Sequence, residues 1–136
     1  MHTISIADLA VSTPDLRSVV SVALFFLASG MQYSCHAHLA SLKKTSSKEG
    51  GGYQLPQHPA FARIVAPHYT AECGLYLALA IFAAPHGAWV NWTLMCALVF
   101  VGVNLGVTAN GTKAWYESKF GKKAVEGKWR IIPFVF

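Results

Sequence analysis

The stretch "APHYTAECGLYLALAIFAA", Ala66 to Ala84, places one carboxylate, Glu72, at the mouth of a long apolar run. Pro85 and Gly87 follow and predict a tight turn. A further apolar run begins after that turn at Trp89. Since about 20 helical residues cover the hydrocarbon core of a bilayer, the two runs predict an antiparallel helical hairpin in a membrane, with tryptophans in the aromatic belt.

The composition supports a membrane chain. Of the 136 residues, 54% are apolar and only 12% are charged, whereas about a quarter of a soluble domain is charged. No Asp, Glu, Lys or Arg occurs between Glu72 and Lys113. The alternative is a soluble three-helix bundle, which would need polar outer faces that the second and third runs do not offer.

An earlier apolar run, from about Leu16 to Tyr33, completes the predicted fold. Ser12 or Thr13 can cap this helix, and its pattern continues to about Lys44. We expect an all-α membrane bundle with three spans, at about 16–34, 68–84 and 89–109, and a short cytosolic C-terminal helix. Residues 1–14 form an N-terminal segment in this interpretation, and residues 15–136 form the membrane domain.

Basic residues set the expected orientation. They gather in the loop from Lys43 to Arg63 and in the tail after Lys113, while the turn at Pro85 carries no charge. The positive-inside rule therefore places the loop and the C-terminus in the cytosol. The expected partners are membrane lipids, and no nucleic-acid partner is expected. The three cysteines lack zinc-site spacing, so no metal site is predicted.

Glu72 is the first candidate for chemistry. An ionised carboxylate at membrane depth usually faces a protein interior or a wet cavity. On a helix it shares a face with His68 and Tyr69, which predicts a polar cluster. The alternative is a carboxylate at a helix start, stabilised by the helix dipole.

The first helix has a polar stripe of its own. Gln32, His36 and Lys43 recur at helical spacing, and Lys43 lies where the helix leaves the membrane. Lys43 could hold a phosphate there. The alternative is an ordinary solvated basic helix end.

Four motifs then match a known pattern. They are "QYSCHAHLASLKK" (Gln32 to Lys44), "YQLPQHPAFARIVAPHYTAE" (Tyr53 to Glu72), "WYESKF" (Trp115 to Phe120) and "RIIPFVF" (Arg130 to Phe136). In this order they resemble the C-terminal domain of the steroid 5-alpha-reductase family. The first motif is most similar to the polyprenol reductase branch.

The resemblance implies a seven-helix enzyme of the endoplasmic reticulum membrane, whose NADPH enters from the cytosol. The polyprenol branch reduces the alpha-isoprene double bond of polyprenol or polyprenal, on the route to dolichol for protein N-glycosylation. Matching positions imply that the cofactor is held by Gln32, His36, Lys43, Tyr53, His68, Glu72, Asn104 and Tyr116. The apolar spans would take the isoprenoid tail of the substrate.

Two departures from the family pattern matter. Only Lys113 stands near the place where the family often has His or Arg before the aromatic pair. The four spans that carry the family's substrate-polarising groups are absent, so the chain resembles the C-terminal half of the enzyme, and the catalytic residues are expected in the other half. Activity of the short chain alone is therefore not expected.

Three other functions stay open at this point. One is a 3-oxo-5-alpha-steroid 4-dehydrogenase or an enoyl-type lipid reductase. Another is an inactive membrane fragment. The third is a methyltransferase of the isoprenylcysteine type, although the R-H-P-x-Y run that those enzymes need is missing from this sequence.

Overall fold

The computed structural model describes residues 14–48 and 51–136. Within these ranges the chain is helical and has no strand. The three long helices are α1 (Leu16–Lys48), α2 (Pro67–Phe82) and α3 (Trp92–Phe120), and the two 3-10 turns are η2 (Pro59–Phe61) and η3 (Lys122–Ala124). This confirms the all-α fold class and the hairpin of the last two apolar runs.

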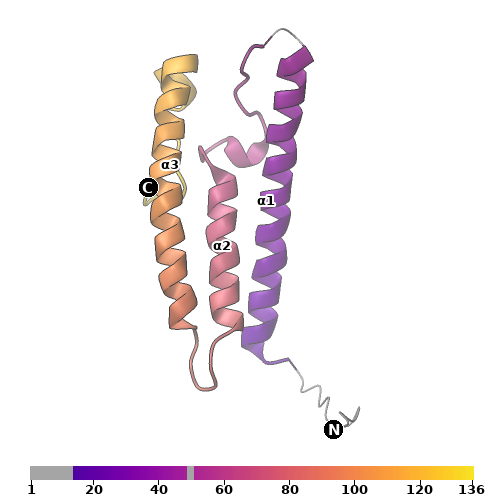
Figure 1. Cartoon of the computed structure of the whole chain (residues 1–136), viewed down its shortest axis with the longest axis vertical. Coiled ribbons are helices and arrows are strands. Elements are labelled where there is room, and N and C mark those ends of the chain that lie inside the picture. Colours follow the sequence, from indigo (N-terminus) through magenta and orange to yellow (C-terminus); the bar gives the residue numbers. More distant parts are fainter. Residues whose placement is uncertain (1–13, 49–50) are drawn as a thin grey trace, which may run out of the picture.

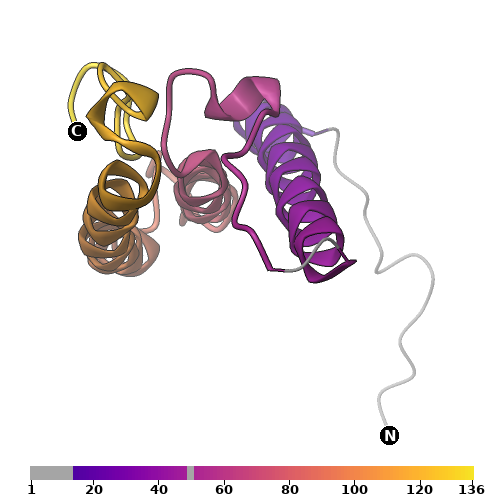
Figure 2. The ribbon, with the colours of Figure 1, turned by 90° about the horizontal axis from the view of Figure 1, so that it is seen from above.

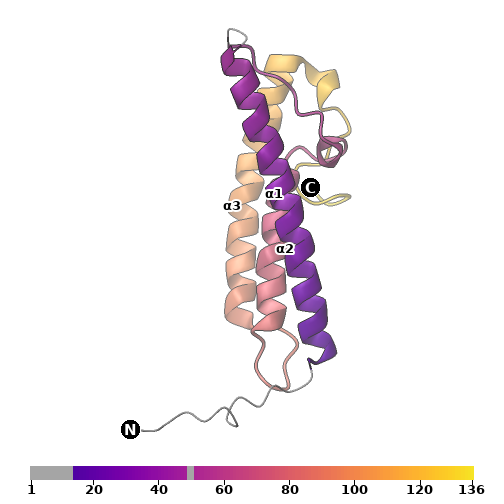
Figure 3. The ribbon, with the colours of Figure 1, turned by 90° about the vertical axis from the view of Figure 1, so that its right-hand side faces the viewer.

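The helices stand side by side with α2 in the middle (Figures 1 and 2). α2 runs opposite to its neighbours and is shorter than both (Figures 1 and 3). The turn of residues 83–91 and the start of α1 lie at one end, which we call the turn end. At the other end, α1 and α3 extend beyond α2, and residues 51–66 and 121–136 fold between and against them (Figure 1). We call this the groove end.

In the part of the chain that the structure describes, two helices, α1 and α3, are long and apolar enough to cross a membrane. Only 17% and 11% of their most apolar stretches are buried, unlike the core helix of a soluble protein. The predicted third span is not confirmed, because α2 has 16 residues, or about 24 Å at the rise of an α-helix. That length falls short of the ~30 Å hydrocarbon core.

Small side chains bring α1 and α2 together. On α1 the buried positions repeat every seven residues, at Ser21, Ala28 and Cys35. A Cβ atom added to Gly74 of α2 would lie 3.2 Å from the Cβ of Ala28. Small residues at such a seam let two backbones approach closely, which is how helices commonly pack in membranes.

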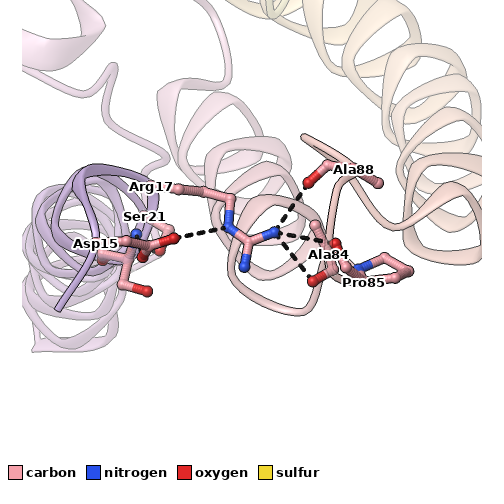
Figure 4. A network of polar contacts seen from close by, with 7 residues as sticks. Asp15, Arg17, Ser21, Ala84, Pro85 and Ala88 are labelled. Carbon is pink, nitrogen blue, oxygen red and sulfur yellow. Dashed lines mark hydrogen bonds and ion pairs between the residues drawn. The ribbon is translucent and has the colours of Figure 1, made fainter. Parts of the chain in front are cut away.

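An arginine closes the turn end (Figure 4). The Arg17 guanidinium donates to the backbone oxygens of Ala84 at 3.0 Å, Ala88 at 2.9 Å and Pro85 at 3.4 Å. Its Nε lies 3.6 Å from the Asp15 carboxylate. Arg17 was not among the basic residues that set the expected orientation, yet its side chain ties α1 to the turn after α2.

The start of α1 corrects a prediction. The Asp15 carboxylate accepts a hydrogen bond from the Ser18 backbone N–H at 2.9 Å, so Asp15 caps the helix. Hydrogen bonds from Ser18 also lower the pKa of Asp15. The predicted caps, Ser12 and Thr13, lie outside the described residues.

The other helix boundaries also differ from those predicted. α1 continues to Lys48, past the expected end near Lys44. α3 begins at Trp92, because the Asn91 side chain accepts from the Leu94 N–H and caps it there. Trp89 therefore precedes α3, which runs on to Phe120. The expected short C-terminal helix is wrong: after α3 only the three-residue turn η3 follows.

The C-terminal tail fastens the groove end. Its residue Trp129 pairs with the extended residues before α2. The Trp129 oxygen accepts from the Val65 N–H at 2.7 Å, and the Trp129 N–H donates to the Arg63 oxygen at 2.9 Å. The Thr70 hydroxyl donates to the Ile131 oxygen at 2.6 Å. Ile131 also packs in a small core with Ala66 and Ala109. The tail thereby joins the segment before α2 to α3.

Candidate functional site

A groove of about 560 Å³ opens at the groove end, between α1 and α3. Its lining comes from the emerging part of α1, the segment after it and the last turns of α3. The lining residues include Lys43, Ser46, Tyr53, Pro56, Trp115 and Tyr116. The structure thus brings together three predicted site residues, Lys43, Tyr53 and Tyr116, that are far apart in the sequence.

Aromatic rings form one wall of this groove. The Tyr53 ring meets Trp115 edge to face, with centroids 5.1 Å apart, and Trp115 lies 5.4 Å from Tyr116. The Lys119 ammonium lies 5.7 Å from the centre of the Tyr53 ring, within reach of a cation–π contact. An aromatic wall with nearby cations can stack on a flat heterocycle and attract anionic groups.

Two further predicted residues, His36 and His68, meet beneath the groove. Their ring centroids are 5.1 Å apart, and His68 also lies 6.2 Å from Phe61. A small cavity lined by Pro56, Phe61 and Tyr116 lies next to the groove and shares Pro56 and Tyr116 with it. The His68 Nδ1 atom is buried and has no hydrogen-bond partner among the described residues, so its capacity for a hydrogen bond is unused there.

Glu72 lies one helical turn beyond His68 and is half-buried. The first turn of α2 holds no acidic residue, so Glu72 stands beyond the turn where the helix dipole stabilises a carboxylate most. Within residues 14–48 and 51–136, its carboxylate forms no ion pair. The helix-start alternative therefore does not explain this charge.

The remaining two predicted residues lie apart from the groove. Gln32 is half-buried on α1, two turns before the first lining residue, Leu39. Asn104 is exposed on α3 and does not line the groove of Lys43. Since its neighbours Val103 and Gly106 line a second groove and Asn104 does not, Asn104 points away from both.

Two lysines of the tail region are engaged in the structure. The Lys128 ammonium donates to the Phe61 oxygen at 2.9 Å, and burial lowers its pKa. The Lys113 ammonium donates to the Lys128 oxygen at 2.7 Å. Lys113, which stands near the family's His or Arg position, therefore secures the tail.

Sequence reasoning missed Trp115 as part of the groove. The residue was quoted within "WYESKF" but was given no role, although it contacts both Tyr53 and Tyr116. The available signal was its helical spacing: Trp115 and Lys119 are one turn apart and share a face. That face meets the segment after α1 only in the folded chain.

A second groove, of about 910 Å³, lies between α2 and α3 and is almost entirely apolar. Its lining includes Cys73, Leu77, Val99, Val103, Val107 and Phe136. Gly106 lets the tail close one end, because a Cβ added there would lie 3.4 Å from the Phe136 ring. The groove of Lys43 is thus polar and aromatic, and the groove between α2 and α3 is apolar.

Known proteins similar to this chain are reductases of the family that its motifs resemble. The model of a family described as 3-oxo-5-alpha-steroid 4-dehydrogenase matches residues 6–136. Polyprenal reductase 2 of Oryza sativa subsp. indica is 32% identical over 116 residues, which is 85% of this chain and 31% of the relative. The polyprenal reductase of Xenopus tropicalis is 31% identical over 121 residues, 87% of this chain and 37% of that protein.

A more distant relative carries a different name. A steroid 5-alpha-reductase of Solanum lycopersicum is 27% identical over 115 residues, 85% of this chain and 42% of the relative. No solved structure matches the chain. The chain spans 31% to 42% of the length of these three relatives.

Proposed function

The chain belongs to the 3-oxo-5-alpha-steroid 4-dehydrogenase family, and from this premise we propose that it is the NADPH-binding part of a membrane reductase that acts on polyprenal or polyprenol. The reaction is the reduction of the alpha-isoprene double bond, on the route to dolichol for protein N-glycosylation. Most of the relatives that the chain resembles at about 30% identity are named polyprenal reductases. We place the enzyme in the endoplasmic reticulum membrane, with the groove end in the cytosol.

The observation that carries the proposal is the groove of Lys43, Tyr53 and Tyr116. Its volume, about 560 Å³, falls within the range of small-molecule sites. It combines a cation with aromatic rings that contact one another, and His68, whose buried Nδ1 has no hydrogen-bond partner among the described residues, lies near it. These donors fit a dinucleotide, which has anionic phosphates, flat rings and a carboxamide.

The roles of the residues follow from their chemistry. Lys43 attracts the phosphates, while Tyr53 and Trp115 pack on a flat ring. Glu72 and His68 serve the nicotinamide end, where an unpaired carboxylate can accept hydrogen bonds from the carboxamide. When bound, NADPH supplies the hydride. Gln32 and His36 extend the same stripe of α1, and Asn104 is kept only as a prediction from the family pattern.

The substrate is assigned to the isoprenoid class because the second groove offers a long apolar surface. A 3-oxosteroid reductase is the second candidate, favoured by the description of the family and by the tomato relative. Groups that polarise the substrate are expected in the part of the relatives that this chain does not match.

Binding of NADPH tests the first part of the proposal. The chain is placed in lipid nanodiscs and its NADPH affinity is measured by the fluorescence of the reduced nicotinamide. Because a hydrogen bond to a charged group contributes about 1.5–3 kcal/mol, Lys43→Met and Glu72→Gln should each weaken binding roughly tenfold or more. Lys44→Met is the matched control, since Lys44 is exposed one residue away and does not line the groove.

Two results would contradict cofactor binding in this groove. One is a chain that binds no NADPH although its helices are formed. The other is equal affinity for NADPH in the Lys43→Met and Lys44→Met variants.

A chimera tests the substrate. This chain replaces the matching segment of the rice polyprenal reductase, and the chimera is given NADPH with polyprenal, polyprenol or a 3-oxosteroid. We expect saturation of the alpha-isoprene unit. Reduction of the steroid alone would select the second candidate and overturn the isoprenoid assignment.

A further inference from the structure

Two histidines outside the proposed cofactor residues join a wall of the groove to α1. The Nε2 atom of His38, on α1, accepts a hydrogen bond from the Gln57 backbone N–H at 3.2 Å. His58 stands just before η2, and its Nε2 lies 2.9 Å from the Ser34 hydroxyl on α1. Its Nδ1 accepts from the Ala60 N–H at 3.2 Å. Two contacts thus cross to α1, and the third fixes the ring of His58.

These contacts require both rings to be neutral. A backbone N–H only donates, so the ring nitrogen that accepts from it must carry no proton. In His58 the proton of the neutral ring is therefore on Nε2, which donates to Ser34 Oγ. A protonated imidazole has donors at both nitrogens. Protonation would set N–H against N–H at Gln57 and again at Ala60.

The surroundings add to this effect. The rings of His38 and His58 are 5.6 Å apart, so two positive charges there would repel each other. Both rings flank Phe61, at 6.1 Å and 6.4 Å.

The titratable groups near Phe61 from the other elements carry no negative charge. The His68 ring of α2 lies 6.2 Å from Phe61, and His36 of α1 meets His68. The Lys128 ammonium of the tail donates to the Phe61 oxygen, and Tyr116 of α3 lines a small cavity with Phe61. Among the described residues, the ion pair within 4.0 Å is Asp15 with Arg17, at the turn end. No carboxylate of the described chain therefore pairs with either ring.

We propose that His38 and His58 form a proton-sensitive latch, in which the neutral rings hold residues 53–60 against α1 and protonation of the rings releases them. Tyr53 and Pro56 lie on this segment and line the groove. Release therefore dismantles one wall of the groove. The latch does not depend on what the groove binds, and its test needs no ligand.

Hydrogen exchange of single backbone amides, followed by NMR on the whole chain in nanodiscs, tests the latch. Rates are corrected for the intrinsic effect of pH and compared at about pH 7.5 and about pH 4.5, well to either side of the usual titration of imidazole. The amides of Gln57 and Ala60 should exchange roughly three- to tenfold faster at the lower pH, the effect of losing a hydrogen bond. Amides in the middle of α3 serve as the internal control.

A variant that cannot titrate sharpens the test. In His38→Gln with His58→Asn, the amide oxygens can accept the same N–H bonds but take up no proton. This variant should stay protected at both values of pH. The pair His38→Leu with His58→Leu removes the acceptors and should exchange fast at both.

The inference is overturned by either of two results. One is a wild-type chain whose Gln57 and Ala60 amides exchange equally at both values of pH. The other is a Gln and Asn variant that keeps the wild-type change with pH, since groups other than these two rings would then cause it. Neither comparison depends on whether the leucine variant folds.

Discussion

The two ends of the bundle are built in opposite ways. At the turn end, a short turn joins α2 to α3, and Arg17 and Asn91 donate to backbone oxygens of this turn, at Ala83, Ala84 and Ala88. At the groove end, α1 and α3 extend past α2, and irregular segments fill the space between them. There a carboxylate, Glu72, has no ionic partner among the described residues, and a buried nitrogen of His68 has no hydrogen-bond partner.

This difference separates stability from binding. At the turn end, the Arg17 guanidinium is engaged by backbone oxygens and by the Asp15 carboxylate, although its Nε has no hydrogen-bond partner among the described residues. Polar groups that are left unsatisfied at the groove end lower stability, and unpartnered buried groups of this kind mark candidate functional sites. Changes at the turn end should therefore alter unfolding and spare binding, while changes in the groove should do the reverse.

The largest effect is expected at Arg17. Its guanidinium donates to three carbonyls, so Arg17→Leu should lower the free energy of unfolding by about 2–3 kcal/mol, the contribution of hydrogen bonds to a charged group. Denaturant unfolding in micelles measures this change. NADPH affinity should stay the same.

Arg17→Lys is the matched control, because a lysine keeps the charge but not the fork of donors. It should restore part of the lost stability. If Arg17→Leu unfolded like the wild type, the turn end would not be held by this side chain and the contrast between the ends would fail.

The next effect concerns the tail. Thr70→Val removes the bond of 2.6 Å to the Ile131 oxygen and leaves that half-sheltered acceptor unpaired. The free energy of unfolding should fall by about 1 kcal/mol, measured in the same way. Thr108→Val is the control, since the Thr108 hydroxyl bonds only within exposed α3. Equal losses in both variants would show that the tail adds nothing to stability at the groove end.

The smallest effect is expected at Tyr53. Tyr53→Leu removes its contact with Trp115 and should weaken NADPH binding roughly two- to tenfold, as aromatic pairs contribute about 0.5–1.5 kcal/mol. The unfolding midpoint should not change, because Tyr53 is exposed. Tyr33→Leu, at an exposed position on α1 far from the groove, should leave the NADPH affinity and the unfolding midpoint unaltered. If Tyr53→Leu shifted the unfolding midpoint without weakening NADPH binding, Tyr53 would contribute to stability and not to the binding site.

Local patterns predicted the helices well. The apolar runs around Leu16 and after Trp89 became α1 and α3, and Pro85 and Gly87 became the turn. Boundaries were less certain, because capping depends on which side chain reaches an N–H: Asp15 caps α1 and Asn91 caps α3. The predicted span of 68–84 differs from α2, Pro67–Phe82, by one residue at its start and two at its end, since hydropathy shows which residues avoid water and not where a helix ends.

The candidate site was predicted in pieces. The stripe of Lys43 and the aromatic pair at Tyr116 could be read as local motifs, and the structure brings both to one groove. The role of Trp115 as a groove wall was not predictable, because its partner Tyr53 lies more than sixty residues away in the chain. His38 and His58 also showed no pattern, since their contacts join α1 to a segment without regular structure.

The sequence by itself determined that the chain is helical, avoids water along two long runs and belongs to a reductase family, because periodicity, composition and motif order are properties of neighbouring residues. Only the tertiary structure decided where α2 ends, that Arg17 closes one end and that Tyr53 meets Trp115 at the other. Those facts depend on contacts between residues that are far apart in the chain, such as Tyr53 with Trp115 and Arg17 with Ala88, which no local pattern contains.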